Sequence, residues 1–172
     1  MIYSKPDPQE AAEYYFTYIN KVSGDALLEL EKQLDHTPEW LEKHVKDDKL
    51  NYKYADEKWT IAEVLLHIVD CERVMAYRAL RIARGDSTAL PGFDQNLFAP
   101  NSNGQDRNLE SIIDEYQAVR LATLALFDNL NEEQIMRLGT ASDNPVSVRA
   151  LAFIIAGHET HHLQVLETLY SI

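Results

Sequence analysis

The 172-residue chain has very little cysteine and no long apolar run. Cys71 is its single cysteine, so no disulfide can form within the chain, which fits a reducing compartment. No stretch approaches ~18 consecutive apolar residues, the length that a membrane-spanning helix needs. The first residues lack the basic stretch and apolar run of a signal peptide. We therefore expect a cytoplasmic protein with no membrane span.

Basic charge is also scarce. The chain has 16 Lys and Arg against 28 Asp and Glu, which gives a formal net charge of −12. A surface of this sign repels nucleic acid and anionic membranes, and no dense basic cluster offsets it. We therefore expect neither as a partner. Hydrophobic residues make up 45% of the chain, enough for a folded core, and the length fits one domain spanning residues 1–172.

What the sequence does have is helical periodicity, with no convincing alternation typical of strands. Thr60 and Glu63 form a T-x-x-E capping box, and Ser147 can cap the last helix just after the break at Pro145. Pro38 falls inside the first long helix and should kink or split it. Apolar residues recur every three or four positions in four segments: about 25–46, about 60–85, about 109–129, and from 147 onward.

These segments predict an all-α fold, an antiparallel four-helix bundle, preceded by an N-terminal arm or short helix over 1–22. A long crossover loop without periodic pattern, 86–107, joins the second and third long helices. Loops of this length are typical of lids and binding segments. A packed crossover and a substrate-covering loop both remain open. Four apolar residues can anchor it to the bundle: Leu90, Phe93, Leu97 and Phe98.

The last helix carries two histidines where aliphatic residues would be expected. At ~100° per residue, one stripe contains Leu151, Ile155, His158, His162, Val165 and Leu169. A lone His on such a face is most often a structural residue. Two imidazoles one turn apart can point at one atom, as a divalent metal ion requires. A third ligand should lie elsewhere, and His67, on the apolar flank of the second helix, is the best candidate.

Other histidines and Cys71 have simpler interpretations. His36 and His44 stand in charged surroundings and are expected at the surface, and His161 is rotated off the stripe. Cys71 follows His67 by one turn and could reach the ion, but single buried cysteines behave mostly as small hydrophobes. We favour that interpretation. The aromatic group of Tyr14, Tyr15, Phe16 and Tyr18 is expected to pack or to form a dimer contact.

Residues 158–162 match the H-E-x-x-H signature of zinc proteases, in which the Glu is the general base. The extended form of that signature fails, because Val165 and Thr168 occupy the later Gly and His positions. An E-x-x-H half of a di-iron site also occurs, but the second half is missing. Glu159 should therefore be no catalytic base, and we expect it to point toward solvent or a flank of the helix.

The chain resembles the DinB-like superfamily, which includes YfiT-type proteins, over nearly its whole length. The matching segments are KWTIAEVLLHIVDCERVMAYRALRIARGD, LPGFD, VSVRALAFIIAGH and HETHHL. The resemblance implies a single DinB-like domain whose bundle holds one divalent metal ion. Its ligands would be a His on the second helix and an H-x-x-x-H on the last, which fall on His67, His158 and His162. Pro38 is a departure that concerns the shape of the bundle.

Three imidazoles leave coordination positions open, as in catalytic sites, and the ion could be zinc or nickel, with iron or manganese as further choices. The resemblance implies a metal-dependent enzyme that transfers a thiol group or hydrolyses a small substrate, with a low-molecular-weight thiol as a candidate cosubstrate. The alternative is a non-catalytic, metal-stabilised bundle with a partner-binding or stress-related role. The resemblance also leads us to expect a homodimer. No catalytic acid or base can be named.

Overall fold

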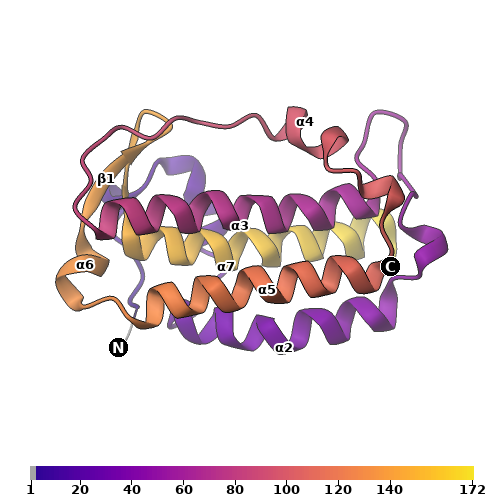
Figure 1. Cartoon of the computed structure of the whole chain (residues 1–172), viewed down its shortest axis with the longest axis horizontal. Helices are drawn as coiled ribbons and strands as arrows, with labels where there is room; N and C mark the ends of the chain where they lie inside the picture. The colour runs from indigo at the N-terminus through magenta and orange to yellow at the C-terminus, as the bar shows by residue number, and fades with distance from the viewer. Residues whose placement is uncertain (1–2) are drawn as a thin grey trace.

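The structure, a computed structural model, describes residues 3–172 as a helical bundle (Figure 1). The four long helices and the all-α fold class are confirmed. No described helix is both long and apolar enough to cross a membrane. The four long helices are α2 (Ala26–His44), α3 (Ile61–Ala83), α5 (Leu109–Asp128) and α7 (Val148–Val165), and α7 continues as a π-helical turn, Leu166–Tyr170.

Helix α3 packs against α5 and α7, and α2 packs against the same two helices. Both α3 and α5 begin beside the segment that follows α2: Ala62 N donates to Leu50 O, and Leu109 N donates to an Asp47 carboxylate oxygen. The crossover between α3 and α5 therefore returns along the length of the bundle (Figure 1), and these two helices run in the same direction. The antiparallel pairs are α3 with α7 and α2 with α5.

The remaining elements are short. Three are helices: α1 (Phe16–Ile19), α4 (Gln95–Phe98) and α6 (Glu132–Met136). Five are 3-10 turns: Pro8–Glu10, Glu13–Tyr15, Asp47–Lys49, Ala99–Asn101 and Gly104–Asp106. Two are strands, β1 (Leu138–Ala141) and β2 (Asn144–Ser147), which pair as an antiparallel hairpin.

The predicted helix caps are present. Glu63 N donates to Thr60 Oγ1 at 3.1 Å, and Thr60 N donates to Glu63 Oε2 at 2.7 Å, so the capping box is complete at the start of α3. Glu63 is thus fully used as a cap. Ala150 N donates to Ser147 Oγ at 3.0 Å at the start of α7. These caps determine where the two helices that carry the predicted ligands begin.

Pro38 does not split the first long helix, because α2 runs unbroken from Ala26 to His44. Proline removes one backbone hydrogen bond from a helix interior, a loss that packing can offset. Here Thr37 and Leu41, on either side of Pro38, are both buried against the rest of the bundle. The helix is thereby held on both sides of the interruption.

The hairpin β1–β2 was not expected from the sequence. Its strands are four residues each, Leu138 is largely exposed and Pro145 lies within β2, so no alternating apolar pattern exists. Its turn has Ser142 and Asp143 in the left-handed region, with φ of 51° and 61°. Tight hairpin turns need this conformation, but glycine or asparagine usually signals it. The crossover adds one bridge, Leu90 with Ala141.

The N-terminal arm is less helical than the predicted segment, and two predicted anchors of the crossover are wrong. Within the arm only Phe16–Ile19 is α-helical. Leu90 is buried and Phe93 packs partly against the core, as expected, but Leu97 and Phe98 are 61% and 40% exposed. Both belong to the short helix α4 and remain largely in contact with solvent.

The interior is apolar at both ends and polar in the middle. One hydrophobic cluster gathers Leu30, Met75, Phe127 and Phe153 with their neighbours, and the other gathers Leu41, Leu65, Ile112 and Leu166 with theirs. Between them, each long helix contributes buried polar side chains: Gln33 and Thr37, His67 and Glu72, Tyr116 and Arg120, His158 and Glu159. The site that the sequence predicts lies in this polar layer.

Gly157 lets the N-terminal arm approach α7 just before His158. A Cβ at this position would lie 2.1 Å from the carbonyl oxygen of Tyr18. We expect Gly157→Ala to displace α1 and to lower the free energy of unfolding by about 1–3 kcal/mol, the usual cost of overpacking. This outweighs the gain of about 1 kcal/mol that alanine brings to a helix. Urea denaturation measures the change, and an equal or higher stability would contradict the close approach.

Candidate metal centre

The three predicted ligands come together. His67 of α3 lies opposite His158 and His162 of α7, and the Nε2 atom of His158 is 3.0 Å from that of His67 and 3.1 Å from that of His162. The ring centroids of His67 and His162 are 4.8 Å apart. Around a tetrahedral zinc ion with Zn–N distances of about 2.0–2.1 Å, ligand nitrogens are separated by about 3.3 Å. The observed spacing is close to that value.

Hydrogen bonding alone does not account for this arrangement. In a neutral imidazole each nitrogen either donates one hydrogen or offers one lone pair. His158 Nε2 faces two other Nε2 atoms, so a hydrogen bond can satisfy one contact well and leaves the other unsatisfied. A cation at the point where the nitrogens converge would use the lone pairs of all three. The donor set therefore fits a divalent metal ion.

Burial keeps these imidazoles neutral. It lowers the pKa of His67 to about 4, and burial followed by repulsion from His67 and His161 lowers the pKa of His162 to about 3. Burial, and then the neighbouring imidazole of His162, also holds the pKa of His158 far below its ordinary range. Only neutral imidazole binds a metal ion, so at neutral pH the three side chains are in their ligating form.

Cys71 is closer to the site than the sequence suggested. It is buried, as expected, but its Sγ lies 4.0 Å from His67 Nε2. His67, Cys71 and His158 also form a set whose potential ligand atoms all lie within 4.8 Å of one another. Burial, and after it the charge of Asp70, raises the pKa of the thiol to about 12, so it is protonated in the absence of an ion. If Cys71 also binds the ion, its sulfur fills the fourth coordination position. If it does not, that position is open to water or a substrate.

Two cavities adjoin the three histidines. One, of about 130 Å³, reaches His158 and is bordered by Tyr14, Tyr18, Cys71, Met75, Phe93, Gln95 and Ser142, among others. The other, of about 230 Å³, reaches His162 and is bordered by Trp59, Val64, Asn96 and Tyr170, among others. Phe93, Gln95 and Asn96 belong to the crossover. The long loop thus borders both cavities, as a substrate-covering loop would.

The aromatic residues of the arm contribute to the site, a role the sequence analysis did not give them. The Tyr18 ring packs edge-on against His158 with centroids 5.2 Å apart, and the Tyr14 and Tyr18 hydroxyls are 2.7 Å apart. Trp59, just before α3, packs on His67 with centroids 4.8 Å apart. In the sequence, a cluster of aromatic residues near the start of a helix looks like ordinary core packing. Only the packing of α1 against α7 shows that Tyr18 contacts a predicted ligand.

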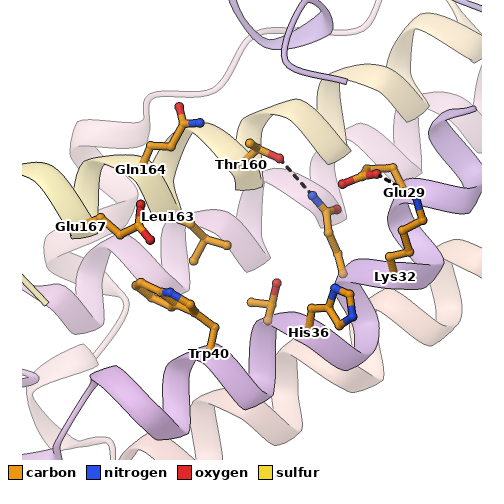
Figure 2. Close-up of a pocket in the computed structure, with 10 residues that line it drawn as sticks. Glu29, Lys32, His36, Trp40, Thr160, Leu163, Gln164 and Glu167 are labelled. Carbon is orange, nitrogen blue, oxygen red and sulfur yellow. Dashed lines mark hydrogen bonds and ion pairs between the residues drawn. The ribbon is translucent and has the colours of Figure 1, made fainter. Parts of the chain in front are cut away.

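Of the other histidines, His36 is at the surface, as expected, and His44 is half-buried, whereas the ring of His161 lies beside the site, 4.9 Å from the ring centroid of His162. His36 is exposed, and His44 contacts Trp40 through its ring and its Nδ1. His161 is half-buried and packs against Tyr18. A separate depression of about 300 Å³, between α2 and α7, includes His36, Trp40 and Thr160 (Figure 2). None of the three predicted ligands borders it.

The prediction for Glu159 was wrong. Its side chain is fully buried and points into the bundle, away from His158, where Arg120 of α5 and Tyr116 bind its carboxylate. Arg120 also donates Nε and Nη2 to Glu72 of α3 at 2.9 and 2.8 Å. Burial opposes the charge of Arg120, but the two carboxylates outweigh it and raise its pKa well above the ordinary value. Thr37 donates a further hydrogen bond to Glu159.

The reason for the error is that α7 has no solvent-facing side along most of its length. Every residue from Val148 to Glu159 is buried, because α3, α2 and α1 all pack against this helix. A rotation of 100° away from the histidines therefore leads into the polar layer and not to water.

The comparisons with known proteins identify the family. The sequence profile that describes the DinB superfamily matches residues 29–166. The chain belongs to the DinB superfamily. A protein of Oceanobacillus iheyensis, named as a candidate metal-dependent hydrolase, is 30% identical over 123 residues, which are 69% of this chain and 69% of that protein. A protein of Geobacillus thermodenitrificans with the same designation is 22% identical over 129 residues, 73% of this chain and 71% of that one.

The solved structure of YfiT from Bacillus subtilis shares this fold. It superposes with a TM-score of 0.73 at 17% sequence identity, over 98% of this chain and 92% of YfiT. YfiT is described as a candidate metal-dependent hydrolase with an unusual four-helix bundle topology. At this identity the likeness shows the fold alone. The parallel α3–α5 pair, produced by the returning crossover, distinguishes the present bundle from a simple up-and-down bundle.

Glu159→Gln should destabilise the fold strongly. The substitution removes one carboxylate from a buried arginine, and breaking a buried ion pair costs about 3 kcal/mol or more. Glu167→Gln, an exposed position on the same helical segment, should change the free energy of unfolding by less than about 0.5 kcal/mol. Denaturant unfolding of both variants measures the difference. Equal stability of Glu159→Gln and Glu167→Gln would show that the carboxylate is not held as described.

Proposed function

We propose that the protein is a metal-dependent hydrolase of a small substrate, with one divalent ion bound by His67, His158 and His162. The observation that carries the proposal is the convergence of three neutral Nε2 atoms, two from buried histidines and one from the half-buried His162, beside two cavities. The names of the two bacterial relatives and of YfiT support the reaction class. Zinc or nickel suits the nitrogen donors best, with iron or manganese as further choices.

Such an ion, when bound, lowers the pKa of a water molecule or a thiol that it coordinates. The chain's own residues supply the surroundings. Trp59 and Tyr18 pack on the rings of His67 and His158 and fix their orientation. Their burial excludes bulk water from the ligands and strengthens electrostatic interactions in the site. The Tyr14 and Tyr18 hydroxyls, hydrogen-bonded to each other, can donate one hydrogen to a substrate oxygen in the cavity beside His158.

Thiol transfer is the second candidate reaction. The residues that border the cavity beside His158 are compatible with it. Among residues 3–172, no carboxylate and no histidine other than His158 borders the cavity beside His158. A metal-activated thiol needs no separate general base, because coordination itself promotes its ionisation. A low-molecular-weight thiol would then be the cosubstrate. A non-catalytic bundle remains the alternative to both reactions, and formation of a homodimer and a cytoplasmic location remain predictions.

His67→Ala tests the ligand set. We expect this variant to stay folded but to bind the ion at least tenfold more weakly, because two imidazoles on one helix leave the ion half coordinated. His36→Ala, which removes an exposed histidine from α2, is the matched control and should keep its metal. Elemental analysis after dialysis, with circular dichroism as a check of folding, measures both. Full metal occupancy in folded His67→Ala would rule out this ligand set.

Replacing the bound ion with cobalt shows whether a coordination position is open and whether a small thiol can bind there. With three nitrogen ligands and an open position, 2-mercaptoethanol at millimolar concentration should produce a sulfur-to-cobalt charge-transfer band. The same band before any thiol is added, and its loss in Cys71→Ser, would mean that Cys71 closes the site and would favour the non-catalytic bundle. No band under either condition would exclude thiol transfer and leave hydrolysis as the reaction to assay.

A further inference from the structure

Three arginines are buried in the described part of the chain, and one of them lacks an acidic partner. Arg120 is 0% exposed and binds Glu72 and Glu159, and Arg149 is 8% exposed and binds Glu10. Arg78 of α3 is 2% exposed, and no carboxylate of residues 3–172 lies within ion-pair distance of it. A buried charge is normally paired, because its removal from water is costly. Within residues 3–172, Arg78 is therefore a buried cation without an acidic partner.

Neutral groups hold the guanidinium of Arg78 in place. Nη2 donates to the carbonyl oxygen of Pro91 at 2.8 Å and to Ser142 Oγ at 3.0 Å, and Nη1 contacts the Met75 sulfur at 3.5 Å. The guanidinium carbon also lies 5.9 Å from the centre of the Phe93 ring. These contacts fix its orientation but do not neutralise its charge. Its Nε donates no hydrogen bond to a described residue.

Arg78 stands directly behind the wall of the cavity beside His158. Three of the side chains it contacts, Met75, Phe93 and Ser142, border that cavity. Helix α3 contributes Cys71 and Met75 to the lining of the cavity, and Arg78 lies about one turn beyond Met75. The positive charge therefore lies one layer of side chains behind the cavity that His158 borders, in a chain whose formal net charge is −12.

Ser142 lies between the guanidinium of Arg78 and the cavity, and it contacts both. Its Oγ accepts a hydrogen bond from Arg78 and takes part in no other hydrogen bond with described residues. Its own hydroxyl hydrogen is therefore free to donate into the cavity, and donation to an anion is strengthened by the adjacent cation. The left-handed backbone at Ser142, φ 51°, places the hydroxyl there at the tip of the β1–β2 hairpin.

We propose that Arg78 and Ser142 recognise an anionic group, a carboxylate or a phosphate, on the substrate that occupies the cavity beside His158. The inference rests on the proposed function only in taking this cavity as the substrate site. The anion would lie at the hairpin end of the cavity, with the reacting group at the histidines. A purely structural role, joining the crossover to the hairpin, explains the two hydrogen bonds of Arg78 but not its unpaired charge.

Thermal unfolding in the presence of small anions tests the assignment. The probes are acetate and inorganic phosphate, with neutral acetamide at equal concentration and constant ionic strength. A ligand that binds only the folded protein raises its melting temperature saturably. We expect acetate or phosphate, but not acetamide, to raise the melting temperature. The anion with the larger effect indicates whether the site binds a carboxylate or a phosphate. Metal content is measured in every sample, so that a protein without metal contradicts the proposed function while leaving the anion response interpretable.

Arg78→Met should lose the anion response, with an apparent affinity at least tenfold weaker, whatever its own stability. Ser142→Gly provides a second variant in case Arg78→Met unfolds: it removes the hydroxyl, glycine tolerates the positive φ, and the response should weaken several-fold. Arg73→Met, which removes a largely exposed arginine of the same helix, should respond like the unaltered protein. Equal effects of acetate and acetamide, or an undiminished anion response in folded Arg78→Met or Ser142→Gly, would overturn the proposal.

Discussion

One guanidinium ties together the two helices that carry the metal centre. Arg120 of α5 binds Glu72 of α3 and Glu159 of α7, and each glutamate directly follows a residue of the site, Cys71 or His158. Removing one partner would leave an uncompensated buried charge, so this contact favours the packing in which the three charges meet. The same contact joins α3 to α7 one residue beyond Cys71 and His158. We therefore expect it to help hold the two helices at the separation that brings the imidazoles together.

The interior of the bundle thus consists of a polar central layer between two apolar clusters, and the two kinds of layer contribute differently to stability. Apolar clusters at both ends of the bundle provide most of the hydrophobic stabilisation, and they leave the central layer free for groups that cost stability. Three desolvated imidazoles that face one another are such groups, and a bound ion would offset their cost. The arm and the crossover cover them from outside, so access runs through the two cavities at His158 and His162. Arg78, a buried cation, lies directly behind the wall of the first of these cavities.

How much the sequence could predict depended on the range of the interactions involved. Local signals were sufficient for the Thr60–Glu63 capping box, the helix that follows it, and the pairing of His158 with His162 one turn apart. His67 was found because a helix destined for the core carried a single histidine on its apolar flank. Each of these features depends on residues within one helix, where periodicity is informative.

Features that depend on packing between elements were missed. Glu159 was expected near solvent because its direction was derived from the periodicity of its own helix alone. In the structure, α7 is covered on three sides by α1, α2 and α3. The hairpin that places Ser142 at the cavity has no glycine at its positive φ angles and no alternating pattern. Tyr18 reaches His158 only because Gly157 admits the arm. Such contacts come from tertiary structure, which overrides local propensity.

Anomalous X-ray diffraction from crystals of the protein, recorded on both sides of the absorption edge of the metal found in it, tests the central claim most directly. The account predicts one strong anomalous peak within about 2.0–2.2 Å of the Nε2 atoms of His67, His158 and His162, with a remaining position open to the cavity beside His158. It would be contradicted by the absence of a peak between these imidazoles in metal-replete crystals, or by a peak whose fourth ligand is the sulfur of Cys71.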